Sequence, residues 1–312
     1  MSPLLTVILF SAPIFLALGM VKFWIYLKQR EARRFPFKDS VMREPGYSQL
    51  KAREKIMEEL DLHLLVLPLY PLMMYTTYLQ MRLSNGEVSL FTISLLVATS
   101  LALIAHSLYK IWCLQAKMHC LKLGYAGEVA VGQALNQLML QGYQVFHDVP
   151  FNHFNADHVV VGRAGVFVVE TKLRTKRSTT NRKERSYKVR FDGKALYFPD
   201  RPKVPCVSAL EQASNEAKSV GNWLTQATGE PVTTQPVLAL PGWWINGTNK
   251  QGLVWVFNHK QLVYLPPADP HRHVLSEARI QAIAYQLQTR CARDDLQPQV
   301  LKTGTDSAFQ EV

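Results

Sequence analysis

Two acidic residues and a lysine lie in a stretch of the chain that is otherwise almost entirely apolar. Residues 156–172 read ADHVVVGRAGVFVVETK, with Asp157 before a run of valines and Glu170 and Lys172 after a second run. Burying charged groups there costs free energy unless the charges pair or hold a metal ion. Two carboxylates can hold one Mg²⁺, and a lysine beside them can orient a nucleophile or neutralise developing charge. This set suits metal-assisted hydrolysis of a phosphodiester.

The stretch predicts two strands joined by a tight turn between Gly162 and Gly165. Glu170 and Lys172 are two residues apart on the second strand, so their side chains project from the same face, whereas Thr171 points away. Asp157 opens the neighbouring strand. The pattern therefore predicts both carboxylates on adjacent strands.

Further elements flank this hairpin. The pattern predicts a helix over residues 124–142, a strand over 143–151, a hairpin with a DG turn over 186–197, a helix over 207–225, strands over 233–241 and 252–257 separated by the loop GWWINGTNK, and a last helix from Ser276. Glu128 lies in the first turn of the first helix, where a glutamate is favoured by the helix dipole alone. Gln212 falls one turn into the helix over 207–225.

The chain becomes strongly basic after Lys172. The candidate nucleic-acid contacts are Arg174, Lys176, Arg177, Arg182, Lys183 and Arg185. A charge run is ordinarily a solvated face, but this one leaves directly from the strand that carries Glu170. We expect either a solvated loop or a phosphate-gripping flap, and the flap predicts strong salt dependence of nucleic-acid binding.

Three aromatic or histidine features admit two interpretations. His147 and His158 lie near the predicted site, where a histidine base is conceivable, but we favour packing or support of other site residues. The pair Trp243-Trp244 can stack on bases, although adjacent tryptophans more often cap the edge of a core.

Composition narrows the partners without choosing among them. The formal net charge is +11 and the isoelectric point about 9.5, which favours a polyanionic partner, either nucleic acid or an anionic membrane face. The 4 cysteines are scattered, without the spacing of a zinc site or a disulfide framework, so a reducing compartment fits.

The apolar residues are concentrated in the first 115 positions. Residues 4–27 are long enough to cross a bilayer, and we favour an anchor over a cleaved signal peptide because MSPLLT carries no basic side chain. Two further apolar runs over 62–81 and 88–114 predict two more transmembrane helices. The first of them contains Pro68 and Pro71, so it is either a kinked span or part of a hairpin. Few ionisable side chains interrupt these runs, so this half is predicted to be an anchor.

The charge distribution predicts a topology. Nine basic residues lie in the segment 28–60, whereas the link 82–87 has only Arg82. The positive-inside bias places the basic loop and everything after residue 115 in the cytoplasm, with the N-terminus outside, at the inner (cytoplasmic) membrane. Residues 28–55 also suit anionic lipid headgroups.

The soluble half resembles a known family. A GE pair in a first helix, then DHVVVG, GVFVVETK and a later helix with glutamine, is similar to the nuclease-related domain (NERD) of the PD-(D/E)XK, restriction-endonuclease-like superfamily. The resemblance runs from about Gly124 to Leu265. It implies a mixed four- or five-stranded sheet flanked by helices, with the site at the sheet edge.

The resemblance also implies site residues. It assigns the helix glutamate to Glu128, the metal aspartate to Asp157, the ExK pair to Glu170 and Lys172, and the supporting glutamine to Gln212. The metal ligands would be Asp157 and Glu170, with Mg²⁺ or Mn²⁺ as the cofactor. The long basic run after Lys172 departs from the short glycine-containing link often found in the family.

These observations predict an α/β protein: a restriction-endonuclease-like mixed β-sheet flanked by α-helices, preceded by an α-helical transmembrane region. The expected organisation is a first transmembrane helix (1–27), a basic cytoplasmic loop (28–61), two further transmembrane helices (62–115), a NERD-like domain (120–293) and a disordered tail (294–312). The expected function is a multi-pass, cytoplasm-facing, Mg²⁺-dependent nuclease acting on nucleic acid, with DNA favoured over RNA. The alternative is a membrane-tethered nucleic-acid-binding module with little or no cleavage.

Overall fold

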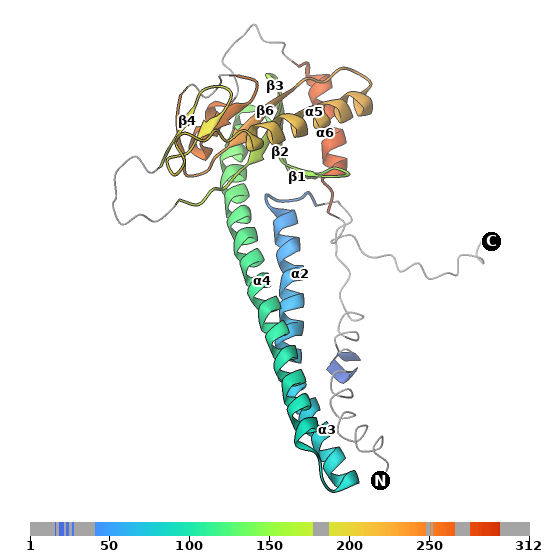
Figure 1. Cartoon of the computed structure of the whole chain (residues 1–312). Coiled ribbons are helices and arrows are strands. Elements are labelled where there is room, and N and C mark those ends of the chain that lie inside the picture. The colour runs from blue at the N-terminus through green and yellow to red at the C-terminus, as the bar shows by residue number, and fades with distance from the viewer. Residues whose placement is uncertain are drawn as a thin grey trace, which may run out of the picture. The chain divides into compact units, whose positions relative to one another are not determined.

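The computed structural model of the chain (Figure 1) describes residues 41–176, 187–247, 250, 252–265 and 275–293, together with the helical residues 16, 19–21, 23–24 and 27. It contains two compact units, one around the helical residues 53–119 and one formed by residues 39–52 and 120–297. The predicted first span (1–27) and the start of the basic loop lie largely outside the described residues, and the predicted tail (294–312) lies wholly outside them.

From residue 41 onward, where the structure describes the chain without gaps up to the sheet, three helices come before it. They are α2 (Tyr47–Val66), α3 (Leu69–Asn85) and α4 (Leu90–Asn136). The first begins inside the segment 28–61 that the sequence pattern predicts to be a loop. Residues 51–60 combine lysine, arginine and glutamate, which are good helix formers and pair favourably at four-residue spacing. Charge alone was therefore a poor reason to predict a loop there.

Turn residues separate α3 from its neighbours. The chain breaks between Val66 and Leu69 at Pro68, as the proline positions predict. Gly86 ends α3 with φ of 77°, and its N–H donates to the carbonyl of Arg82. The hydroxyl of Ser89 accepts the N–H of Thr92 at the start of α4. The connection between α3 and α4 is thus the short segment 86–89, and the first residues of the predicted link 82–87 belong to α3.

Two stretches of the described chain are long and apolar enough to cross a membrane by length and composition. They are Tyr47–Ser84, which includes α2 and α3, and Leu90–Gln141, which includes α4. The latter is much longer than the roughly 20 residues that a bilayer core requires. Its apolar part ends near Leu114, and only the portion after residue 119 joins the sheet-containing unit.

The helix predicted over residues 124–142 is the continuation of α4 and not a separate element. Gly127 and Gly132 do not interrupt it because both lie in tight contacts. A Cβ at Gly127 would approach the side chain of Leu173 to 3.0 Å, and one at Gly132 would approach Pro45 to 2.4 Å. These glycines therefore permit close packing within a continuous helix. The 3-10 turn η1 (Gln137–Gln141) and left-handed Gly142 follow it.

A five-stranded mixed sheet forms the centre of the second unit. In spatial order its strands are β1 (Gln144–Pro150), β2 (Asn155–Gly162), β3 (Gly165–Thr171), β6 (Thr234–Ala239) and β8 (Trp255–Phe257). The first three are antiparallel neighbours, whereas β6 and β8 run parallel to β3. The middle strand is β3, which is buried on both faces and correspondingly rich in valine. The predicted mixed sheet is confirmed.

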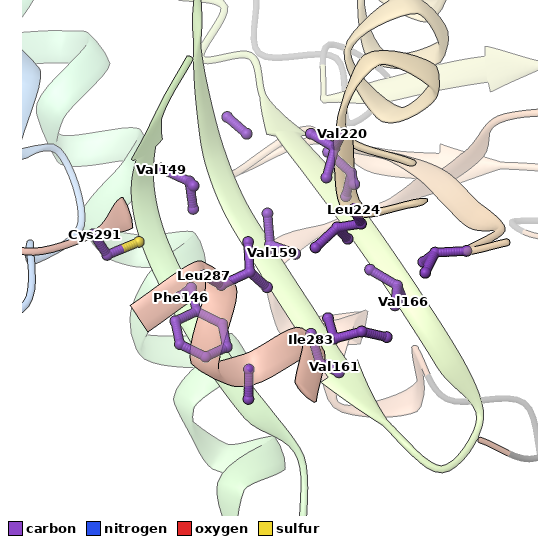
Figure 2. Close-up of a cluster of buried hydrophobic side chains, with 14 of the residues drawn as sticks. Phe146, Val149, Val159, Val161, Val166, Val220, Leu224, Ile283, Leu287 and Cys291 are labelled. Atoms are coloured by element: carbon purple, nitrogen blue, oxygen red, sulfur yellow. The ribbon is translucent and has the colours of Figure 1, made fainter. Parts of the chain in front are cut away.

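Helices cover both faces of this sheet. On one face, α5 (Ser208–Thr228) and α6 (Glu277–Arg290) pack against the strands through Val220, Leu224, Ile283 and Leu287 (Figure 2). On the other face, the end of α4 and the 3-10 helix η2 (His259–Tyr264) pack through Leu135 and Leu262. The layers are therefore helix, sheet and helix, which agrees with the predicted fold class.

A second, three-stranded sheet lies in the same unit. Its order is β5 (Leu196–Tyr197), β4 (Lys188–Phe191) and β7 (Trp244–Asn246). The predicted DG hairpin is confirmed as β4 and β5. The third strand, β7, occupies the segment GWWINGTNK that we predicted to be a loop. Its three residues are too few for a periodic pattern, and only pairing with the distant β4 makes them a strand.

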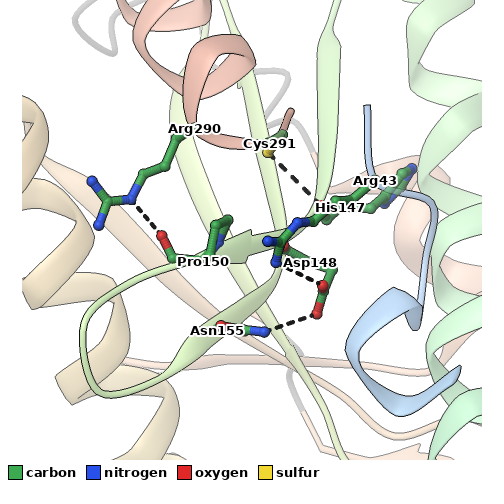
Figure 3. A network of polar contacts seen from close by, with 7 residues as sticks. All are labelled: Arg43, His147, Asp148, Pro150, Asn155, Arg290 and Cys291. Atoms are coloured by element: carbon green, nitrogen blue, oxygen red, sulfur yellow. Dashed lines mark hydrogen bonds and ion pairs between the residues drawn. The ribbon is translucent and has the colours of Figure 1, made fainter. Parts of the chain in front are cut away.

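The segment before α2 packs with the end of α6. The N–H of Arg43 donates to the carbonyl of Cys291 at 3.0 Å, and the N–H of Arg293 donates to Val41 at 2.8 Å. The guanidinium of Arg43 also lies 3.3 Å from the carboxylate of Asp148, a residue on β1 that bonds Asn155 (Figure 3). Residues 41–43 are thus part of the sheet-containing unit, which the sequence did not predict.

Candidate active site

The strand pairing brings Asp157 and Glu170 to the same end of the sheet. Asp157 lies near the start of β2 and Glu170 near the end of β3, and the two strands are antiparallel with His158 opposite Val169. The Asp157 carboxylate accepts the backbone N–H of Thr171 at 2.7 Å. The acids therefore lie together at one end of two inner strands, at the edge of the sheet that the strand ends form.

Glu170 is held by two donors from different elements. Its Oε1 lies 2.6 Å from Nζ of Lys172 and accepts the amide of Gln212 at 2.9 Å. Glu170 is buried and Lys172 is partly exposed. The ion pair has the geometry that alternation along the strand predicts, because residues two apart share a face. The donor from Gln212 fixes the rotamer of Glu170 from the first turns of α5.

Glu216 is a further acid of this cluster that the sequence analysis missed. It lies on α5 four residues after Gln212, whose amide also donates to its Oε1 at 2.8 Å. Glu216 is buried beside the apolar residues Ala213 and Ala217 of the same helix face. An acid on the apolar face, one turn after the glutamine, was the available signal.

Glu128 lies on the last part of α4, within the sheet-containing unit, and its side chain is buried. Gln49 on α2 hydrogen bonds to its side chain. Its Oε2 lacks a hydrogen-bond partner among the described residues, and the same holds for Oε2 of Glu216. Gln49 lies more than seventy residues before Glu128 in the chain, so no local sequence motif predicts this hydrogen bond.

One cavity collects these side chains. It has a volume of about 620 Å³, and its lining includes Glu128, Asp157, Glu170, Lys172, Gln212 and Glu216. Gln49 and Arg174 also line it. All five residues that the sequence predicts for the catalytic set therefore meet in one place.

Three acids of this cavity, Glu128, Asp157 and Glu216, have raised pKa values. Burial, followed by repulsion from Asp148, raises the pKa of Glu128 to about 7. Burial and the neighbouring Glu170 raise the pKa of Glu216 to about 8. Burial, together with repulsion from Glu170 and Glu128, raises the pKa of Asp157 well above its usual range. A cluster of buried acids with too few cations produces this pattern.

Lys172 supplies the main positive charge in the cavity. Burial acts to lower its pKa, but the adjacent Glu170 carboxylate outweighs burial, so the pKa of Lys172 is raised. Its ammonium group is therefore charged at neutral pH. One lysine is too little to balance four carboxyl groups, so the cavity favours a further cation.

The donor set suits a hard divalent cation. Asp157 and Glu170 offer carboxylate oxygens, and Glu128 and Glu216 each have a buried oxygen without a partner among the described residues. In the described part of the chain, no group of three such side chains is already gathered around one point. Two carboxylates with several waters are a common arrangement for Mg²⁺, which retains part of its hydration. The residues therefore fit the predicted metal.

The beginning of the basic run is tied down and does not form a free flap. Arg174 pairs with Asp200 at 2.7 Å and lies 4.0 Å from the ring centroid of Phe198. Lys176 donates to the carbonyl of Gly242 at 2.7 Å. The other predicted contacts lie outside the described residues, namely Arg177, Arg182, Lys183 and Arg185.

His147 and His158 form a buried pair, with Nδ1 atoms 2.9 Å apart. Nε2 of His147 bonds Asn136, whereas Nε2 of His158 has no partner among the described residues. Burial lowers the pKa of His147 to about 4 and the pKa of His158 well below its usual range. The predicted packing role fits this neutral pair.

The sheet-containing unit is thus a helix–sheet–helix domain with a cluster of acids in one cavity at the ends of two strands. Its site is of the carboxylate-based class. The family model of the nuclease-related domain matches residues 123–241. The matched segment contains Glu128, Asp157, Glu170, Lys172, Gln212 and Glu216 and ends after β6. No curated protein and no solved structure matches the chain. The match supports a nuclease-related function for this domain.

Proposed function

We propose that the protein is a membrane-anchored, cytoplasm-facing, Mg²⁺-dependent nuclease that hydrolyses phosphodiester bonds, with DNA as the substrate. The observation that carries the proposal is the cavity in which Asp157, Glu170 and Lys172 meet within the segment that matches the nuclease-related domain. The two long apolar helical stretches support the anchor. The net charge of +11 supports a polyanionic substrate.

Each residue has a role that its position supports. Asp157 and Glu170 would hold the cation, and the cation would supply charge compensation and an acidified water. Gln212 keeps Oε1 of Glu170 oriented through its 2.9 Å hydrogen bond. Lys172 lines the cavity and its side chain is partly exposed, so its ammonium group can bind a phosphate oxygen and stabilise charge that develops there.

Glu128 and Glu216 can hold protons near neutral pH because their pKa values are about 7 and about 8. A group in that range can accept or donate a proton during a reaction. Binding of a cation would favour their ionised forms and so lower both pKa values. We therefore assign Glu128 and Glu216 a supporting role in the site, in which their carboxyl groups accept or donate protons.

The test uses the full chain in detergent, because residues 39–52 pack with the sheet-containing unit. Plasmid and single-stranded DNA are incubated with Mg²⁺ or Mn²⁺. Asp157→Ala and Lys172→Ala should each lower cleavage by about 100-fold or more. Lys218→Ala is the matched control, since Lys218 is exposed on α5. Cleavage that persists in both site variants would refute the assignment.

One observation favours a second function. Glu170 is already engaged by Lys172 and Gln212, and no three-ligand metal group is gathered among the described residues. Such a cavity can also belong to a membrane-tethered nucleic-acid-binding module without turnover. Salt-dependent DNA binding without divalent metal, together with no cleavage under any metal, would favour that function.

A further inference from the structure

The small sheet has one apolar face and one polar, aromatic face. Val189, Phe191 and Ile245 are buried in a cluster with Leu240 and Trp243. The alternate residues of β4 and β7 project the other way and are exposed. We define the outer face of the small sheet as Lys188, Arg190, Tyr197, Trp244 and Asn246. Of the two adjacent tryptophans, Trp243 is therefore buried, with 3% of its surface exposed, whereas Trp244 is 55% exposed.

Strand pairing arranges the outer face in two rows. Lys188 lies opposite Trp244, and Arg190 lies opposite both Tyr197 and Asn246. The Arg190 guanidinium lies 4.0 Å from the centroid of the Tyr197 ring, within the range of a cation–π contact. Neighbouring residues on one face of a sheet lie about 5 Å apart. Each row therefore holds one cation beside one aromatic ring, Lys188 beside Trp244 and Arg190 beside Tyr197.

The chain segment 172–176 leads from the cavity, which Lys172 and Arg174 line, to the small sheet, where Lys176 contacts Trp243 and Tyr187. Nζ of Lys176 lies 5.3 Å from the ring centroid of Trp243 and 5.8 Å from that of Tyr187. Tyr187 accepts the backbone N–H of Trp244 at 2.9 Å. Lys172 pairs with Glu170, and the ammonium groups of Lys176 and Lys188 each lie 5.8 Å from the centroid of the Tyr187 ring. Cations thus occur both at the cavity and beside the outer face of the small sheet.

The acidic residues near these cations are already engaged. Asp192 accepts the N–H groups of Lys194 and Ala195 within the β4–β5 turn, and Asp200 pairs with Arg174. A phosphate chain following the cations would thus meet mainly positive charge. Folding alone gives no reason for Trp244 to be an exposed tryptophan opposite Lys188, because its neighbour Trp243 already fills the core.

We propose that the outer face of the small sheet binds single-stranded nucleic acid, with Trp244 stacking on a base and Lys188 and Arg190 contacting phosphates. Single strands are favoured over duplex because stacking on a side chain requires the open face of an unpaired base. The proposal rests on the proposed function, since it describes how the strand leaving the cavity would be held.

Binding of a labelled oligothymidylate of about 15 nucleotides tests the proposal. Fluorescence anisotropy is measured on the full chain in detergent, in EDTA and in Ca²⁺, with a duplex of the same length in parallel. Trp244→Ala should weaken single-strand binding about tenfold and duplex binding less than about twofold. Arg190→Ala should weaken binding and reduce the salt dependence, log K against log salt, by about 0.7.

Matched controls are Tyr285→Ala, which removes an aromatic side chain that is 68% exposed on α6, and Lys218→Ala on α5. Neither should change binding. If wild type binds or cleaves nucleic acid while Trp244→Ala is unaffected, this proposal is overturned and the proposed function stands. If no variant binds nucleic acid at all, both are overturned. A Trp244-dependent emission shift on anionic nanodiscs, with no response to oligonucleotide, would show that the face meets lipid and would overturn the proposal.

Discussion

The side-chain amide of Gln212 bridges two carboxylates, donating to Oε1 of Glu170 at 2.9 Å and to Oε1 of Glu216 at 2.8 Å. One residue from α5 thus links an acid on the middle strand to an acid on its own helix. The bridge holds two acids close together, and their ionised forms would repel each other. It makes Gln212 a positioning residue for the cavity.

Loss of this bridge should impair cleavage without unfolding the protein. We expect Gln212→Ala to lower metal affinity or cleavage by about 10- to 100-fold, because residues that orient ligands have effects of that size. Gln226→Ala, an exposed glutamine of the same helix, is the control. The melting temperature and the Mg²⁺ concentration for half-maximal cleavage are measured for both. Equal metal dependence in the two variants would contradict the assigned role.

Glu216 should make the metal-free protein less stable as pH rises. Its folded-state pKa of about 8 exceeds its ordinary value, so between about pH 4.5 and 8 the folded state binds more protons than the unfolded state. Stability from this group is present at low pH and is lost as pH rises to 8. Glu216→Gln should make the stability less dependent on pH. At pH 8 its free energy of unfolding should exceed that of wild type by about 1–3 kcal/mol, measured by thermal unfolding in EDTA.

The control for Glu216→Gln is Glu211→Gln, which changes an exposed acid in the first turn of α5. It should leave the pH dependence of the melting temperature as in wild type. A Glu216→Gln protein that melts at a lower temperature than wild type at pH 8 would mean that the carboxylate is stabilising without metal.

Divalent cations should stabilise the protein directly. A cation that binds the ionised cluster removes its repulsion, so Mg²⁺ or Mn²⁺ should raise the melting temperature more at pH 8 than at pH 6. When the cation concentration is 100 times its dissociation constant, the free energy of unfolding rises by about 2.7 kcal/mol. The double variant Asp157→Asn, Glu170→Gln should lose the effect. An equal shift in that variant would place the ion elsewhere.

The ion pair between Arg43 and Asp148 should stabilise the sheet-containing unit. Asp148 is buried, and its carboxylate lies 3.3 Å from Arg43 and 3.3 Å from the amide of Asn155. Removing one partner of a buried pair leaves an uncompensated charge and costs about 3–5 kcal/mol. Arg43→Met should therefore lower the melting temperature clearly, whereas Arg163→Met in the β2–β3 turn should not. Equal melting temperatures of the two variants would show that residues 41–43 are dispensable for the stability of the sheet-containing unit.

The histidine pair should give the opposite pH dependence from Glu216. The pKa values of His147 and His158 are lowered in the folded state, so their contribution is complete above about pH 6.5 and is lost as pH falls toward 4. His158→Asn should reduce the acid-side slope by up to about 1.4 kcal/mol per pH unit. The exposed His153→Asn is the control, and thermal unfolding from pH 4 to 7 provides the measurement.

The sequence by itself determined the local features of this protein. Valine-rich runs around Gly162 and Gly165 predict the β2–β3 hairpin because alternation and turn chemistry act over a few residues. Alternation also predicts Glu170 and Lys172 on one face. The match of α5 and α6 to their predicted helices has the same origin, since an apolar stripe at helical spacing is visible in sequence.

Only the tertiary structure decided which distant residues join these features. Gln49 reaches Glu128 from α2, and Glu216 joins Glu170 through α5, because packing of helices on the sheet brings them together. The three residues of β7 became a strand only by pairing with β4, which left Trp244 outside and Trp243 in the core. Contacts of this kind depend on long-range packing and pairing, which no local pattern encodes.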